Sequence, residues 1–470
     1  AHKMKSWLLI LGAVIMLLNF PASLAVKSKR VVCYFGSWSV YRLEDGKFKI
    51  DYIDPNLCTH GIYSFVGITS DGGIRILDSW NEIDNGGFTH FNGLKQRNPD
   101  FKTLVAIGGW NEGSTTFSSV VNDQSRRATF VRNIVDFVRK HQFDGFDLDW
   151  EYPGQRGGAA TDKAAFSKLL QELRTEFNKH GLILSAAVAA SEASASLSYN
   201  IPDLNTYLDF INIMTYDMHG SWDPVTGHNS PLYPGPLKDG FTVQQAIQYW
   251  ISAGATPEKI NMGIGTYGRS FTLSGQAQCA LGAPANGAGN AGLYTREAGF
   301  LGYNEICEKM STWNVHWDDQ QQVSYACNGN QFVGYDSIQS IKIKAEYVVQ
   351  QGLGGIMVWS VETDDFLGKC HGVKYPLITA INEVLYGDVI TPSPTTPTPS
   401  TTTPTPSTPP NITPGGDPSQ LCTREGYIRD PSDRGVFYQC QKVGDVFIAH
   451  RKECPAGLVF DTSINVCTWA

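Results

Sequence analysis

The chain has 470 residues, of which 42% are hydrophobic and 17% charged, so it can bury a sizeable core and is too long for one small domain. Its formal net charge is −8 and no run of Lys or Arg is present, which argues against a nucleic-acid partner. A neutral polymer is compatible with this balance.

The first segment has the pattern of a secretory signal peptide. Lys5 supplies a basic start, and the apolar stretch that follows, residues 7–20, is too short to span a bilayer comfortably. Small residues at Ser23 and Ala25 predict cleavage after Ala25, so that residues 1–25 are removed; a membrane anchor is the alternative. We therefore expect a secreted, extracellular protein without membrane contact after cleavage.

The next part of the chain alternates short apolar segments with helical patterns. Strands are predicted at Val31–Trp38, Thr59–Phe65, Thr103–Trp110, Phe143–Tyr152, Leu182–Ala189, Phe210–Tyr216, Met262–Tyr267 and Ile356–Ser360. Helical patterns include Arg126–Arg139, Lys163–Lys179 and Val243–Ser252. Eight such units predict an α/β fold, a TIM (β/α)8 barrel, with a doubly wound open sheet as the alternative. The long gap before the last strand predicts an inserted α+β subdomain at about residues 270–338.

The fourth predicted strand carries acidic residues at alternate positions. Read with the period of two of a β-strand, one face holds Gly145, Asp147, Asp149 and Glu151, and the other face is apolar. The apolar face suits the layer beneath the outer helices. The acidic face must therefore point into the barrel.

This carboxylate row favours acid catalysis. Like charges that close cannot all be ionised at neutral pH, so at least one pKa must rise and the row must titrate as a coupled set. Glu151 comes last, nearest the carboxyl rim where barrel enzymes hold their sites, and it can stay protonated to donate to a leaving group. A solvated acidic strand or a calcium site is the alternative, which the fully apolar opposite face disfavours.

A segment rich in Thr, Pro and Ser follows the barrel, over residues 391–414. Such a composition cannot bury a core, so we expect an extended, O-glycosylated linker at residues 389–416. The sequon at Asn411 predicts N-glycosylation. The linker separates a large domain, residues 26–388, from a small one, residues 417–470.

The pattern DxxDxDxE, here Asp144, Asp147, Asp149 and Glu151, resembles the signature of family-18 glycoside hydrolases, and in particular animal chitinases of the acidic mammalian type. Other segments similar to that family are Gly108-Gly109-Trp110, Met214-Thr215-Tyr216-Asp217 and Met357-Val358-Trp359. The resemblance covers nearly all of the chain from about residue 31. It implies a TIM barrel that hydrolyses the β-1,4 linkages of chitin without a cofactor.

The resemblance also implies a retaining, substrate-assisted mechanism, which is an exception to the two-carboxylate rule of glycosidases. Glu151 would protonate the glycosidic oxygen while the substrate's own N-acetyl carbonyl attacks the anomeric carbon. Asp149 would hydrogen-bond the acetamide N–H, Asp147 would share a proton with Asp149, and Tyr216 would hydrogen-bond the acetamide oxygen. Water activated by Glu151 would then complete the hydrolysis.

Aromatic residues at the predicted strand ends suit the flat C–H faces of sugars, although core packing is the commoner fate of any one ring. By resemblance, Trp359 forms the floor of the subsite of the cleaved sugar, and His219 beside the motif is expected to be structural. The further residues expected to contact substrate are Tyr34, Trp38, Trp110, Met214, Tyr216, Asp217, Trp222, Tyr267 and Arg269.

Ten cysteines in an exported chain predict disulfides, and because none forms a CxxC pattern no metal site is expected. The family resemblance implies two bridges, Cys33–Cys58 and Cys307–Cys370. Cys279 and Cys327 both fall in the insertion and remain to pair with each other.

Residues 417–470 resemble a small, β-rich, peritrophin-type chitin-binding domain. That family usually has six cysteines and this chain has four here, so the resemblance implies Cys422–Cys440 and Cys454–Cys467, with one bridge lost. A domain this small needs such staples. The aromatic residues that would bind chitin, or form the small core instead, are Tyr427, Phe437, Tyr438 and Trp469.

Three other functions compete with a secreted, monomeric endo-type chitinase. A lectin of the same fold would lack the acid that Glu151 supplies. An endoglycosidase of N-glycans would not need the C-terminal domain, and a structural lining protein would not need a buried acidic row. Chitin and chito-oligosaccharides are therefore the expected ligands.

Overall fold

The computed structural model describes the greater part of the chain: residues 29–235, 241–275, 278–387, 422, 426–430, 433–434, 436–443, 446–454, 458–461 and 466–469. The chain divides into two compact units, within residues 1–393 and 394–470. The predicted signal peptide, the predicted linker and Asn411 lie outside the described residues. In the described part of the chain, no helix is both long enough and apolar enough to cross a membrane.

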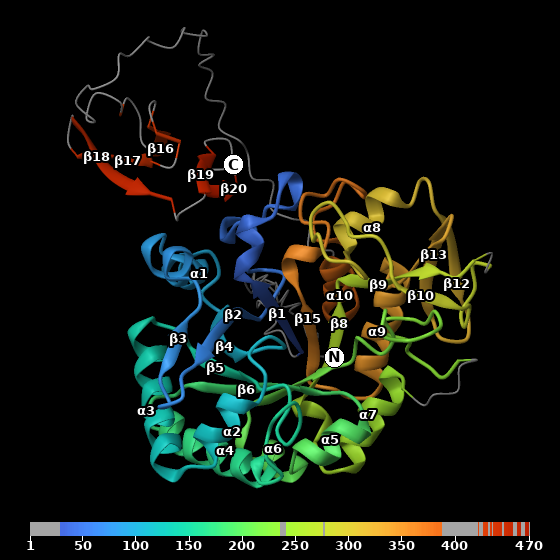
Figure 1. Ribbon diagram of the computed structural model, residues 1–470. Coiled ribbons are helices and arrows are strands. Elements are labelled where there is room, and N and C mark those ends of the chain that lie inside the picture. Colours follow the sequence, from blue (N-terminus) through green and yellow to red (C-terminus); the bar gives the residue numbers. More distant parts are fainter. Residues whose placement is uncertain are drawn as a thin grey trace, which may run out of the picture. The chain divides into compact units, whose positions relative to one another are not determined.

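Parallel strands close into a barrel in the first unit (Figure 1). Strand β1 pairs with β15 on one side and with β2 on the other, which closes the ring and excludes the open sheet. The barrel strands are β1 (Arg30–Gly36), β2 (His60–Ile68), β4 (Lys102–Gly108), β5 (Gly145–Asp149), β6 (Ile183–Ala189), β7 (Phe210–Met214), β8 (Ile260–Gly265) and β15 (Gly355–Trp359). Every predicted strand is present, with ends that differ by a few residues. A short strand that was not predicted, β3 (Ile74–Ile76), pairs antiparallel with β2.

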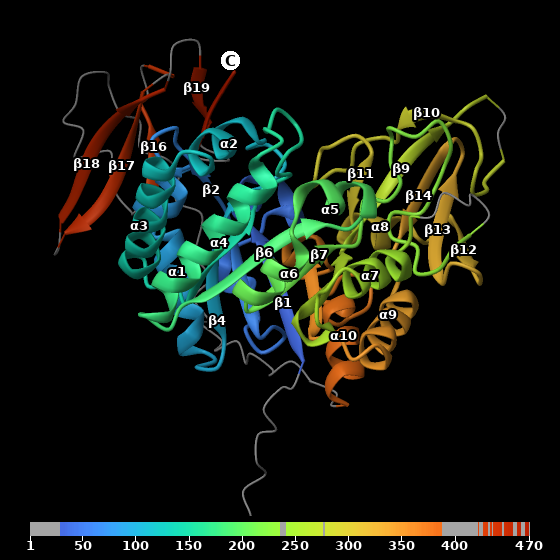
Figure 2. The ribbon, with the colours of Figure 1, turned by 90° about the horizontal axis from the view of Figure 1, so that it is seen from below.

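Helices cover the outside of the barrel (Figures 1 and 2). Helix α7 (Val243–Ser252) has the predicted bounds, and α3 (Gln124–Lys140) and α4 (Asp162–Asn178) nearly so. Helix α3 begins where the Asp123 side chain accepts the Arg126 N–H, and it ends on two basic residues that suit its dipole. The other helices of this unit outside the insertion are α1 (Gly87–Gly93), α2 (Thr115–Val121), α5 (Glu192–Ser198), α6 (Ile201–Tyr207), α9 (Ile338–Gln350) and α10 (Pro376–Tyr386).

Side chains along the barrel strands alternate between two buried layers. At β5, Phe146, Leu148 and Trp150 belong to the large apolar core between strands and helices. Asp147 points the other way and accepts a hydrogen bond from Tyr34, a residue of the smaller cluster inside the barrel. The acidic face therefore points inward as predicted.

The gap before β15 folds into an α+β subdomain. It contains strands β9 (Tyr267–Leu273), β10 (Ala285–Ala288), β11 (Phe300–Gly302), β12 (Asn314–Asp318), β13 (Val323–Asn328) and β14 (Gln331–Tyr335), and helix α8 (Tyr303–Lys309). Only Thr266 separates β9 from β8, so this subdomain begins slightly before the predicted residue 270. Tyr267 and Arg269 consequently lie on its first strand.

The predicted cysteine pairing agrees with the structure wherever it is described. The disulfides present are Cys33–Cys58, Cys279–Cys327, Cys307–Cys370 and Cys422–Cys440. Cys454 is also disulfide-bonded. The side chain of its predicted partner, Cys467, lies outside the described ones, so that pair stays a prediction.

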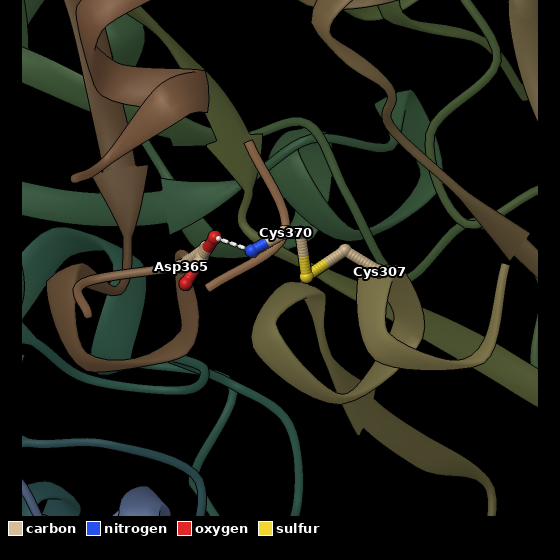
Figure 3. Close-up of side chains that lie close together, drawn as sticks. All are labelled: Cys307, Asp365 and Cys370. Carbon is tan, nitrogen blue, oxygen red and sulfur yellow. Dashed lines mark hydrogen bonds between the residues drawn. A yellow bond between two sulfur atoms is a disulfide. The ribbon is translucent and has the colours of Figure 1, made fainter. Parts of the chain in front are cut away.

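One of these bridges lies in a cluster of potential metal ligands, Cys307, Asp365 and Cys370 (Figure 3). Both sulfurs are used by the disulfide, and an Asp365 oxygen accepts the Cys370 N–H at 2.8 Å. The cluster thus ties α8 to the loop after β15 and offers no free set of ligands.

In the described residues of the C-terminal unit there are two small antiparallel sheets, as expected for a β-rich domain. Their strands are β16 (Gly426–Arg429), β17 (Val436–Val443) and β18 (Val446–Glu453) in one, and β19 (Leu458–Asp461) and β20 (Val466–Trp469) in the other. Tyr438 is 5% exposed and its hydroxyl donates to Asp430, so the structure assigns this residue to the core and not to a binding face. Phe437 is half-buried, whereas the side chains of Tyr427 and Trp469 lie outside the described ones.

Candidate active site

A cleft of about 1480 Å³ opens at the carboxyl end of the barrel. Its lining includes the last residues of barrel strands, among them Gly108, Asp149, Ala189, Met214 and Trp359. This is the end of a β/α barrel where enzymes place their sites. The insertion contributes a wall to the same cleft, through residues such as Arg269, Glu297 and Phe300.

Asp147 is fully buried at the inner end of the carboxylate row. The hydroxyls of Tyr34 and Ser185 donate to its two oxygens at 2.7 and 2.5 Å, and Asn212 donates to Tyr34. Burial raises the pKa of Asp147 to about 6, although these hydrogen bonds lower it. Tyr34 is itself buried and its hydroxyl orients Asp147; because Tyr34 also belongs to the lining of the cleft, its contact with substrate stays a prediction.

Asp149 lies next along the row and lines the cleft. Burial raises its pKa well above the ordinary value, and the charges of Glu151 and Asp147 add to this effect. Its Oδ1 atom is buried and has no hydrogen-bond partner among the described residues. Because buried polar atoms are normally paired, this oxygen marks a position for a ligand.

Glu151 lies in a bend two residues beyond the last residue of β5, although the predicted strand included it, and it is 9% exposed at the cleft. Burial raises its pKa to about 7; a hydrogen bond from Tyr152 and the charge of Arg156 oppose the rise, while Asp217 adds to it. Arg156 donates to the main-chain oxygen of Glu151 at 2.9 Å. Its guanidinium also lies 3.6 Å from the ring centre of Trp110.

The other side of the cleft floor is organised around Asp217. The Tyr267 hydroxyl and Arg269 Nε both donate to its Oδ1 at 2.6 Å. Tyr267 is buried and its hydroxyl is a partner of Asp217, so its direct contact with a sugar stays a prediction. Tyr216 packs edge-on against Tyr267 with ring centres 6.0 Å apart, and both Tyr216 and Met214 line the cleft.

Large aromatic rings are exposed along the cleft. Trp38, Trp110 and Trp222 are 43%, 59% and 56% exposed, which is unusual for tryptophan and typical of a ligand surface. Trp359 is partly buried and stacks on Phe65 with ring centres 5.6 Å apart. All four predicted tryptophans therefore line one cleft.

Two residues of the predicted motifs have structural surroundings. Asp144 lies at the opposite end of the β5 segment, where it accepts the Thr103 N–H and pairs with Lys95 at 3.1 Å. His219 contacts Asp223 through Nδ1 at 3.1 Å, which agrees with its expected structural role.

Several residues of the site were not predicted. Ser185 and Asn212 stand as single polar residues in otherwise apolar strands, and that break in the pattern was an available signal. Tyr152 was assigned to the apolar face of the strand, yet it lines the cleft because the strand ends before it. Arg156 lies in a glycine-rich loop with no pattern to single it out.

Residues 30–364, more than half of the chain, match the family model of glycosyl hydrolases family 18. This chain belongs to that family. As a family-18 member it is a glycoside hydrolase, and the cleft with its carboxylate row is the candidate active site. Residues 422–470 match the model of the chitin binding Peritrophin-A domain.

Relatives of this family-18 chain share most of its length. Chitotriosidase-1 of Mus musculus is 38% identical over 94% of this chain and 95% of its own. The Group IV chitinase of Ostrinia furnacalis, solved in complex with allosamidin, is 45% identical, with a TM-score of 0.75 over 76% of this chain and 98% of that one. Human YKL-39, described as a pseudo-chitinase that retains chitooligosaccharide binding, is 40% identical, with a TM-score of 0.72 over 76% and 99%.

Proposed function

We propose that this chain is a secreted, extracellular chitinase that cleaves β-1,4 linkages between N-acetylglucosamine units by a retaining, substrate-assisted mechanism. The observation that carries the proposal is the buried row at the base of the cleft. In it, Glu151 is poised as an acid and Asp149 presents an oxygen without a partner among the described residues. Both groups face a cleft lined with exposed tryptophans.

In the first step, Glu151 gives its proton to the glycosidic oxygen as the bond from that oxygen to the anomeric carbon breaks. A pKa of about 7 keeps Glu151 largely protonated below neutral pH. The acetamide oxygen of the same sugar attacks the anomeric carbon and forms a cyclic oxazolinium. The electron pair of the broken bond stays on the departing sugar, which leaves with a new hydroxyl.

Asp149 orients the acetamide in this step. Its unpartnered Oδ1 accepts the acetamide N–H, and its negative charge balances the positive charge that develops on the ring. The raised pKa of Asp149 means that it must lose a proton to do so. Buried Asp147, itself held by Tyr34 and Ser185, is the neighbour in the row that can take it.

In the second step, water adds to the anomeric carbon and opens the cyclic intermediate. Glu151, now ionised, accepts a proton from this water, which restores the acid. Attack on both occasions inverts the anomeric carbon, so the overall result is retention. Tyr216, beside the same pocket, donates to the acetamide oxygen and steadies it during both steps.

The matched C-terminal domain supports an insoluble chitin surface as the physiological substrate. A tethered binding domain raises the effective concentration of the catalytic unit at such a surface. A binding protein without cleavage is the competing function, because YKL-39 combines this fold with chitooligosaccharide binding as a pseudo-chitinase. The protonatable Glu151 in the cleft favours the enzyme.

Retention is tested by the anomeric form of the first products. We expect the wild-type protein to release β-anomers from N-acetylglucosamine hexamers, observed by proton NMR before mutarotation. Initial α-anomers would show inversion and exclude the mechanism. Binding of the hexamer with no products at all would favour the non-catalytic function.

The charge of Arg156 is expected to set the highest pH at which the enzyme remains active. Because Arg156 lowers the pKa of Glu151, Arg156→Gln raises that pKa, and the protonated acid then persists to higher pH. We expect the alkaline limb of the kcat/KM profile, near pH 7 in the wild type, to move upward by about half a unit to one unit.

Arg132→Gln is the matched control, because it removes the same charge from an exposed position on α3. It should leave the limb in place. An Arg156→Gln limb that stays at the wild-type pH, or moves downward, would show that Glu151 is not the group whose protonation limits the reaction.

A further inference from the structure

Strands β1 and β15 separate before they reach the cleft. Their registered backbone pairs run from Arg30 opposite Gly355 to Cys33 opposite Val358 and end there. Gly36 and Trp359, the last residues of the two strands, lie beyond this ladder. Trp38 and Trp359, two aromatic rings of the floor, therefore sit where no backbone pair of these two strands fixes their separation.

The buried carboxylate of Glu362 spans this gap. The Gly36 N–H donates to its Oε2 at 3.2 Å, and the Ser360 hydroxyl donates to its Oε1 at 2.6 Å. Gly36 precedes Trp38 by two residues, and Ser360 directly follows Trp359. One side chain, itself in the lining of the cleft, thus links the ends of both strands.

Burial, contacts with Arg42 and the lack of a side chain at Gly36 hold Glu362 in this position. It is 1% exposed, and Arg42 both lies 3.9 Å from its Oε1 and donates to its main-chain oxygen at 3.1 Å. A Cβ atom at Gly36 would come within 2.7 Å of Oε1, so only glycine admits the carboxylate here. On its far side, Trp359 is anchored through its main-chain oxygen, which accepts the Thr266 N–H at 3.0 Å.

The two rings that Glu362 links form a continuous surface. The ring centres of Trp38 and Trp359 are 6.2 Å apart, and Phe65 stacks on both, at 6.1 and 5.6 Å. Stacking on a sugar depends on ring separation and tilt, so a shift of one strand end against the other weakens binding without touching the carboxylate row.

We propose that Glu362 is a positioning residue that sets the separation and tilt of Trp38 and Trp359 by bridging the ends of β1 and β15. It thereby sets the affinity of these two rings for consecutive sugars. This role rests on the proposed function, which names chito-oligosaccharides as the ligand. It touches no reacting atom, so it acts on binding more than on the chemical step.

The test compares Glu362→Ala with two conservative variants. Ala removes both links, Asp is too short to span them, and Gln keeps an acceptor for Gly36 while its amide can donate to Ser360. We expect Glu362→Ala to raise KM for N-acetylglucosamine hexamers about tenfold with kcat within about threefold, Asp to do so less strongly, and Gln to restore KM to within about threefold of wild type.

Asp364→Ala is the control for a purely structural effect. Asp364 is also fully buried and accepts N–H groups of Leu377 and Ile378 at the start of α10, and it is not among the residues that line the cleft. Its loss should lower the melting temperature and leave KM unchanged. If the Glu362 variants likewise lower only the melting temperature, or reduce kcat while KM stays constant, the inference is overturned.

Affinity measured in a Glu151→Gln background separates this inference from the proposed function. Hexamer binding is followed by tryptophan fluorescence in this parent and in the double variant that adds Glu362→Ala, so no cleavage is needed. A roughly tenfold weaker affinity of the double variant supports the positioning role even if the wild type proves inactive. Equal affinities overturn the role alone, and no binding by the folded parent overturns both.

Discussion

Replacing Glu151 by Gln is expected to reduce kcat for N-acetylglucosamine hexamers by about 10³- to 10⁴-fold, with KM changed only a few-fold. Gln keeps the size of the side chain and its hydrogen-bonding reach, but it has no proton to give to the leaving oxygen. The measurement is steady-state hydrolysis, with product separation by size. The result follows from the position of Glu151 at the cleft, where burial raises its pKa to about 7.

The binding of hexamer to Glu151→Gln serves as the control for this result. Because the exposed tryptophans are untouched, its affinity should remain close to that of the wild type. A variant that retains more than a tenth of wild-type kcat would assign the acid to another group.

Asp149→Ala is expected to have the second large effect, a loss of about 10²- to 10³-fold in kcat. In the proposed mechanism, the variant removes the oxygen that orients the acetamide and the charge that balances the oxazolinium. KM should change less, because the aromatic floor still binds the sugar rings. Single-turnover hydrolysis of the hexamer measures the step directly.

Asp144→Ala is the matched comparison, since Asp144 belongs to the same sequence pattern on the same strand segment. It contacts Lys95 and Thr103 far from the cleft, so its loss should lower stability while kcat stays near wild type. Equal losses of kcat in the two variants would mean that both act through folding.

The barrel was predictable because each strand is an apolar run between helical patterns, and such runs pair in chain order. The ends of these strands were less predictable. The regular alternation of β5 stops at Asp149, so Tyr152 lines the cleft, a position that a continued strand would not give it, whereas Glu151 lies at the cleft as the alternation predicted. The strand β3 is three residues long and half-exposed, and it carries too little pattern to be recognised.

The carboxylate row was also predictable, because a strand with one acidic and one apolar face must turn its acidic face into the barrel, where buried carboxylates indicate a functional site. The partners of the row were not predictable, because these contacts form only when the barrel closes. Ser185 on β6 then reaches Asp147 on the neighbouring β5, and Asn212 on β7 reaches Tyr34 on β1, a strand with which β7 does not pair. The alternation along β1 also indicates one of these partners. Tyr34 shares the inward face of β1 with Val32, which indicates a buried side chain able to reach the row.

The central claim, that the substrate's own acetamide is the nucleophile, is tested by cutting chitosan in which about half of the sugars keep their acetyl groups. The new reducing ends, which come from the sugar that reacts, are then identified by mass spectrometry. We predict that every new reducing end carries N-acetylglucosamine, whatever sugar follows the cut. New reducing ends of glucosamine in proportion to their abundance would contradict the mechanism and point to a nucleophile on the protein.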